Sequence, residues 1–168
     1  MLFDLKTFTL IHVAISLAGI ASGFVVMYGL LAGRRLDGWT AFFLITTAAT
    51  SATGFGFPLV HFGAPHWVGV ISLAVLAVAV LARYALRLAG AWRRIYVICA
   101  VLAFYLNVFV GVVLAFQKVP FLRALAPTQS EPPFLLTQLA VLVLFVALAV
   151  AAAVRFRVEP VRTPARAA

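Results

Sequence analysis

Long apolar runs limit the folds open to this 168-residue chain more than any other feature. Five runs have about the 20 residues that an α-helix needs to cross a bilayer. The predicted spans are residues 8–32, 39–60, 67–88, 95–116 and 134–154. Inside lipid only helices and closed barrels satisfy their own backbone hydrogen bonds, and runs of this length favour helices. We therefore expect an all-α integral membrane protein, built as a bundle of five transmembrane helices.

Composition supports the same class. Hydrophobic residues make up 65% of the chain and charged residues 10%, whereas soluble domains average about 45 to 50% and about 25%. We expect a single domain over residues 1–154 and a basic, disordered tail over residues 155–168. The net charge of +9 is accounted for by basic residues that flank spans and meet anionic lipid headgroups, so nucleic acid is not an expected partner.

The basic residues are divided unequally between alternate gaps, which sets an orientation. One side would carry Arg34, Arg35, Arg83, Arg87, Arg93, Arg94, Arg155, Arg157, Arg162 and Arg166. The other would carry only Lys6, Lys118 and Arg123. By the positive-inside rule we expect the amino terminus outside and the carboxyl terminus in the cytoplasm. Abundant arginine and alanine indicate GC-rich coding, so we expect the inner membrane of a bacterium.

The longest gap, residues 117–133, is expected to be ordered. Pro120 occupies a first-turn position before a short amphipathic stretch, which predicts a small interfacial helix. A turn rich in proline follows and is stiff. The sequence leaves open whether this gap is a plain connector or a lid.

Two stripes of small and polar residues mark the faces that pack against protein. In the first span His12, Ser16, Gly19 and Gly23 share one side of the helix. In the second span the shared side carries Thr47, Ser51, Gly54, Pro58 and His61. The GxxxG pattern of the first stripe serves either internal packing or association with a second copy. The hydroxyl-rich second stripe serves either packing or a path for a small neutral solute.

Polar groups gather at the outer ends of the predicted spans and define a hypothetical site. A b-type haem or a quinone there would use His12, His61, Asn107, Tyr105 and Trp67. A metal ion would use His12, His61 and His66. A transmembrane di-haem protein would need histidines at both faces, and the spans have none at the inner face. A proton-coupled transporter would usually need a buried acid, and no span contains Asp or Glu.

No nucleophile and base pair or phosphate-binding loop points to an enzyme. We therefore expect a small noncatalytic membrane protein that acts as an accessory or assembly subunit of a larger complex, through a membrane protein partner or a second copy of itself. The alternatives are a redox-associated protein with haem b or quinone near the outer face, and a permease for a small neutral solute.

Overall fold

The computed structural model describes residues 4–57 and 63–156, and within these ranges it is helical without strands. The helices are α1 (Leu5–Leu31), α2 (Asp37–Gly54), α3 (Ala64–Val80), α4 (Trp92–Lys118), α5 (Pro120–Leu125) and α6 (Pro132–Arg155). A π-helical turn, η1 (Leu81–Ala85), continues α3.

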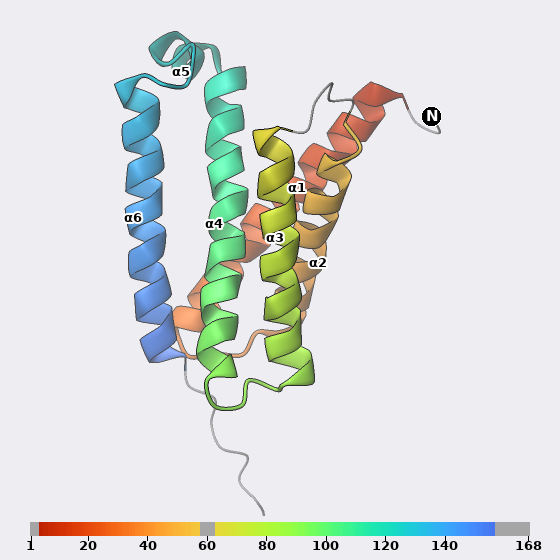
Figure 1. The fold of residues 1–168 in the computed structure, drawn as a ribbon, viewed down its shortest axis with the longest axis vertical. Coiled ribbons are helices and arrows are strands. Elements are labelled where there is room, and N and C mark those ends of the chain that lie inside the picture. The colour runs from red at the N-terminus through yellow and green to blue at the C-terminus, as the bar shows by residue number, and fades with distance from the viewer. Residues whose placement is uncertain (1–3, 58–62, 157–168) are drawn as a thin grey trace, which may run out of the picture.

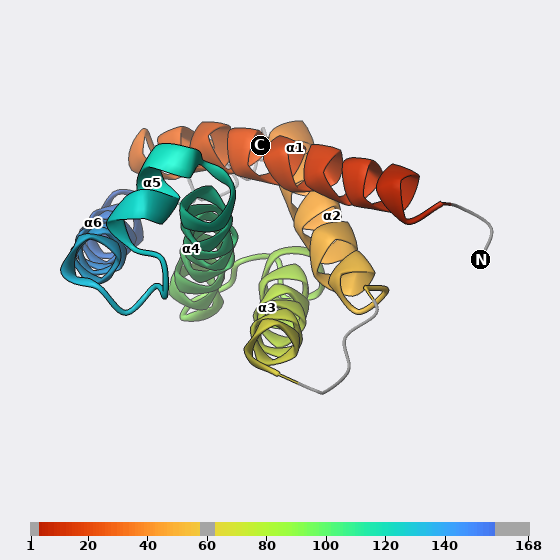
Figure 2. The same ribbon diagram turned by 90° about the horizontal axis from the view of Figure 1, so that it is seen from above.

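The five long helices run alternately up and down (Figure 1). We call the end at which α1 begins and α4 ends the upper end, and the opposite end the lower end. Seen from above, α6, α4, α3 and α2 form an open row, and α1 slants across one face of it (Figure 2). Through this slant α1 packs on α2, α4 and α6. The described basic residues follow the predicted division, since all but Lys6, Lys118 and Arg123 lie at the lower end.

In the described part of the chain, four helical segments are long and apolar enough to cross a membrane, as expected of a membrane protein: Leu5–Leu31, Pro65–Ala85, Trp92–Lys118 and Pro132–Arg155. Helix α2, which corresponds to the predicted span 39–60, is not among them. It has 18 residues against 21 to 27 in the others, and its many threonines make it less apolar.

The observed helices match the predicted spans closely at α1, α4 and α6, and the short helix that Pro120 predicts is α5. The predicted helix 67–88 is wrong at its end. The α-helix stops at Val80, the π-helical turn follows, and Arg87 and Leu88 both have positive φ, at 49° and 59°. This left-handed pair turns the chain so that Leu88 is buried. Of the expected tail over residues 155–168, Arg155 belongs to α6 and Phe156 is buried, and residues 157–168 lie outside the described residues.

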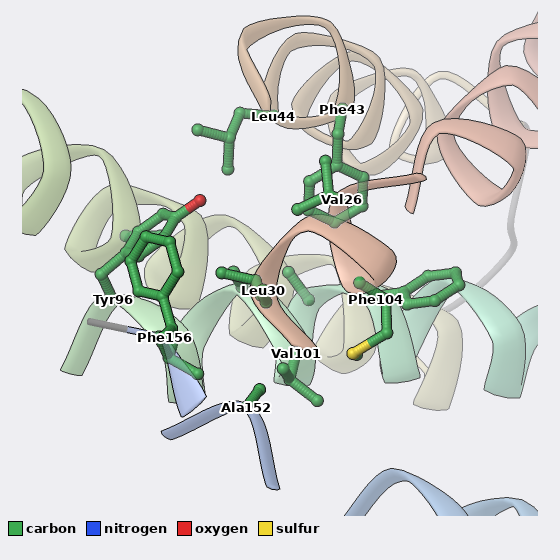
Figure 3. Close-up of a cluster of buried hydrophobic side chains, with 14 of the residues drawn as sticks. Val26, Leu30, Phe43, Leu44, Tyr96, Val101, Phe104, Ala152 and Phe156 are labelled. Atoms are coloured by element: carbon green, nitrogen blue, oxygen red, sulfur yellow. The ribbon is translucent and has the colours of Figure 1, made fainter. Parts of the chain in front are cut away.

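The hydrophobic core lies where α1 crosses α2, α4 and α6 (Figure 3). Val26 and Leu30 of α1 pack among Phe43 of α2 and Phe104 of α4. Gly23 makes this crossing possible, because a Cβ atom built on it would lie 2.4 Å from the Phe104 ring. The glycine pattern of the first span therefore serves internal packing, as one of the two interpretations had it.

Candidate functional site

His12 lies on the face of α1 that packs against the upper part of α2. Its Nδ1 is 2.8 Å from the Thr53 hydroxyl oxygen. The Thr53 hydroxyl is also 2.7 Å from the Ala49 carbonyl oxygen, and when it donates its proton there, its oxygen accepts the bond from His12 Nδ1–H. In the neutral imidazole, Nε2 is then unprotonated and can act as an acceptor or a metal ligand. The Phe57 ring packs edge-on against the imidazole, with centroids 5.0 Å apart.

His66 lies on the opposite side of the chain that leaves α2. Its Nδ1 accepts a hydrogen bond from the Gly63 N–H at 3.1 Å, at the start of α3. Its ring faces Phe55, with centroids 5.7 Å apart. Phe55 thus contacts His66 while Phe57 contacts His12, so the turn that follows α2 contacts both histidines.

Asn107 joins α4 to α2 well below the histidines. Its amide nitrogen donates to the Thr47 hydroxyl at 3.0 Å. Gly19 makes room for it, since a Cβ atom there would lie 3.3 Å from the amide nitrogen. Gly19 follows His12 by about two helical turns, or about 10 Å along α1. Asn107 and His12 therefore both lie next to α1 and α2, but about two helical turns apart, so they do not contact each other.

The structure places Tyr105 against α6 and Trp67 at the start of α3. The Tyr105 ring packs on Phe145 of α6, with centroids 5.7 Å apart. Trp67 is 59% exposed at the start of α3. Among the described residues of the predicted haem or quinone site, Asn107 and Tyr105 thus contact helices other than α1, and His61 lies outside the described residues.

The metal hypothesis depends on His61, which lies outside the described residues. Within residues 4–57 and 63–156, no group of three or more His, Cys, Asp or Glu side chains is close enough to hold a metal ion. His12 and His66, the two ligands that are described, each have a structural contact instead.

Helix α2 links its neighbours through its hydroxyl groups. Thr53 bonds to His12 of α1, Thr47 to Asn107 of α4, and Ser51 to Ser72 of α3 at 2.9 Å. Thr46, Ser51 and Thr53 also donate to carbonyl oxygens one turn back in α2, as membrane hydroxyls commonly do. These hydroxyl groups thus join α2 to three helices, which favours packing over a solute path.

A second polar cluster, around Arg83, lies at the lower end. The sequence predicts only a role in membrane orientation for this arginine. Arg83, in the π-helical turn, is 4% exposed. It forms an ion pair with Asp37, at the first turn of α2. Its guanidinium also lies over Tyr96 of α4, 5.1 Å from the ring centroid. The signal available in the sequence was the rarity of acids, since only four residues of the chain are Asp or Glu and Asp37 lies on the arginine-rich side.

The loop from α5 to α6 folds back onto α4 at the upper end. Gln129, with φ of 60°, donates from its amide to the Val113 carbonyl oxygen at 2.8 Å. The Glu131 carboxylate accepts bonds from the backbone N–H groups of Thr128 and Ser130, at 3.0 and 3.1 Å. Desolvation would raise the pKa of Glu131, but these bonds outweigh it and lower the pKa below its usual value. The loop is therefore ordered, whether it acts as a connector or as a lid.

Comparison with known proteins gives no relative for this arrangement: no family model, no curated protein and no solved structure matches the chain.

Proposed function

We propose that all five long helices cross the inner membrane of a bacterium, with the amino terminus outside and the carboxyl terminus in the cytoplasm. The alternation of the five helices supports this arrangement, because α2 runs from the lower to the upper end like α4 (Figure 1). The gathering of arginines at the lower end supports the orientation. The same arginines are suited to contact anionic lipid headgroups.

Within that membrane, we propose that the protein is a noncatalytic accessory or assembly subunit, held to a larger membrane complex through α6. The observation that carries this proposal is how little of α6 its own bundle covers. In the most apolar 18-residue stretch of α6, 11% of residues are buried, against 28% in the corresponding stretch of each of the other three apolar helices. The exposed side chains include Leu135, Leu136, Leu139, Leu142, Val143, Leu144, Val146, Val150 and Val154.

The surface of α6 is suited to a helix as well as to lipid. Ala140 and Ala147 are exposed on one side of it, spaced by about two helical turns. Small residues in such a stripe let a neighbouring helix approach closely, which drives association where lipid offers no hydrophobic gain. The occupant would be a helix of a partner membrane protein or of a second copy of this chain.

The polar groups inside the bundle support a noncatalytic role. Asn107 and three hydroxyl groups of α2, those of Thr47, Ser51 and Thr53, are engaged in bonds that hold helices together. Such bonds stabilise a fixed arrangement, which is what a subunit that presents a surface requires.

Substitution on α6 tests this proposal. Ala147→Trp would block close approach to α6, and Ala14→Trp makes the same change on an exposed face of α1. After purification in mild detergent, native mass spectrometry should find the partner with the wild type and with Ala14→Trp, but not with Ala147→Trp. A wild type that is monomeric, or a partner that survives Ala147→Trp, would contradict the proposal.

A second candidate, a redox protein that holds one b-type haem near the upper end, is favoured by the bond of His12 Nδ1 to Thr53, because it leaves Nε2 free of that contact. An unprotonated Nε2 can ligate iron, whereas it cannot donate a hydrogen bond to a quinone carbonyl. Haem therefore suits this histidine better than an oxidised quinone does. The purified protein should show a Soret band that disappears in His12→Ala and remains in His66→Ala. A colourless protein supplied with haem would exclude this candidate.

The third candidate, a permease for a small neutral solute, would use α2. Its described hydroxyl groups bond largely within the bundle, so this candidate has less support than the other two. Solute flux in proteoliposomes that equals the flux in empty vesicles would exclude it for the solutes tested.

A further inference from the structure

A polar pocket lies at the upper end, between the end of α4 and the loop that follows α5. Its volume is about 300 Å³, within the size range of small-ligand sites. It is lined by Phe116, Gln117, Arg123, Pro127, Thr128 and Gln129. These residues come from α4, α5 and the folded loop, so the pocket exists only because the loop turns back onto α4.

The hydrogen bonds of the loop leave N–H groups of the pocket lining available as donors. The Gln129 amide donates to Val113 and accepts, at 3.4 Å, from Gln117. Gln117 keeps a second amide hydrogen. Among the described residues the one ion pair is Arg83 with Asp37, so Arg123 has no acidic partner. The nearby Glu131 carboxylate accepts its bonds from Thr128 and Ser130.

We propose that this pocket binds a phosphate group, and that the phosphate belongs to the headgroup of an anionic phospholipid. A guanidinium beside an amide N–H is the donor set that suits phosphate oxygens, and Arg binds them in two-pronged geometry. Lys118, the last residue of α4, adds positive charge close by.

The position of α5 favours a lipid as the source of the phosphate. Helix α5 begins two residues after the spanning helix α4 ends, so it lies at the level of the membrane surface. Its Phe121 and Leu125 are 70% and 44% exposed, while Leu122 packs inward against the cluster around Phe116. Apolar side chains on the outer face of such a helix insert beside lipid headgroups. A lipid next to α5 would therefore present its phosphate to Arg123.

The test uses the full chain in a nonionic detergent, with native mass spectrometry to count bound lipid. Phosphatidylglycerol is the probe, and diacylglycerol, which has no phosphate, is the comparator. Arg123→Gln should weaken phosphatidylglycerol binding about tenfold, the effect of losing one charge-assisted bond. Lys118→Gln is the matched control, because it removes the same charge from a residue that does not line the pocket, and it should weaken binding less than about threefold.

A second variant controls for loss of binding through misfolding. Gln117→Glu places a negative charge in the pocket wall and should weaken binding about as strongly as Arg123→Gln, with an unchanged circular dichroism spectrum. Equal losses in Arg123→Gln and Lys118→Gln, no loss in either, or equal binding of diacylglycerol would each overturn the proposal. Inorganic phosphate that binds the wild type but not Arg123→Gln, without phosphatidylglycerol binding, would overturn the lipid source and assign the pocket to a soluble phosphate.

Discussion

At the scale of single residues, Gly23 is where an added methyl group meets the least room. A Cβ atom there would lie 2.4 to 2.9 Å from three atoms of the Phe104 ring, which is itself buried in the core (Figure 3). Overpacking of this kind costs about 1 to 3 kcal/mol. We expect Gly23→Ala to lower the free energy of unfolding in detergent by that amount. Gly38→Ala is the control, since nothing lies within 4 Å of its Cβ position, and an equal loss there would refute the explanation.

The bond between Asn107 and Thr47 can be measured as a coupling. Double-mutant cycles on hydrogen bonds within membranes average about 0.6 kcal/mol and reach about 1.7 kcal/mol. We expect a coupling in this range between Asn107→Leu and Thr47→Val, from unfolding titrations of the two single variants and the double variant. Asn107→Leu with Thr137→Val should show no coupling, because Thr137 bonds to Pro133 within α6. Additive effects in both cycles would mean that Asn107 does not join the helices.

At the residue level, the sequence predicts the helix contact of the small residues correctly, because a stripe of glycines in a membrane helix is suited to close packing. The small residues Gly19 and Gly23 lie in a helix contact as their spacing indicates. The partners of the polar residues could not be predicted in the same way. Tyr105 and Asn107 are two positions apart and so face different helices, α6 and α2, which a stripe drawn on one helix does not reveal.

At the scale of elements, the end of α3 is held by an ion pair that the helix pattern does not predict. Without Asp37, Arg83 would be a buried cation without a partner, which is costly, although access of water at Asp37 reduces the cost. We expect Asp37→Asn to lower the free energy of unfolding by about 1 to 2 kcal/mol. Asp4→Asn, an exposed acid before α1, should change it by less than about 0.5 kcal/mol. Arg83→Lys should not preserve stability, because lysine lacks the planar group that lies over Tyr96.

The loop before α6 should open in acid. Because the pKa of Glu131 is lower in the folded loop than in an unfolded chain, the fold favours the ionised carboxylate. Its contribution is fully present above the usual pKa of a glutamate and is lost as the pH falls through the lowered pKa. Hydrogen exchange at Thr128 and Ser130, corrected for the intrinsic effect of pH, should become faster over that interval. Glu131→Gln should remove this acid dependence, and a dependence that persists in the variant would assign it to another group.

Element boundaries in the sequence were readable where proline or a change to charged residues marks them, as at Pro120 and Pro132. The end of α3 was not, because Leu86 and Leu88 continue the apolar run. What ends the helix there is tertiary: Leu88 is buried by a left-handed turn, and Arg83 is drawn to Asp37 of another helix.

At the scale of the whole molecule, hydropathy indicates which segments are apolar but not how the helices are arranged. The row of α6, α4, α3 and α2, with α1 slanted across it (Figure 2), depends on close contacts such as that of Gly23 with Phe104. This arrangement also places α2 beside α1 and α3, although α2 is less apolar than those two helices. Since Thr53, Thr47 and Ser51 each bond to a different neighbour, α2 can lie in lipid with its polar groups facing protein.

This property of α2 makes the number of spans a measurable prediction. If α2 crosses the membrane, residues 38 and 65 lie on opposite sides of it, and if it does not, they lie on the same side. In a Cys99→Ala background, which removes the one native thiol, we expect a membrane-impermeant maleimide to label Pro65→Cys and Ser130→Cys from outside intact cells. Gly38→Cys should react only after the cells are opened. The reverse pattern would invert the orientation, and labelling of residues 38 and 65 from the same side would reduce the bundle to four spans, with α2 held against the membrane by its bonds to α1, α3 and α4.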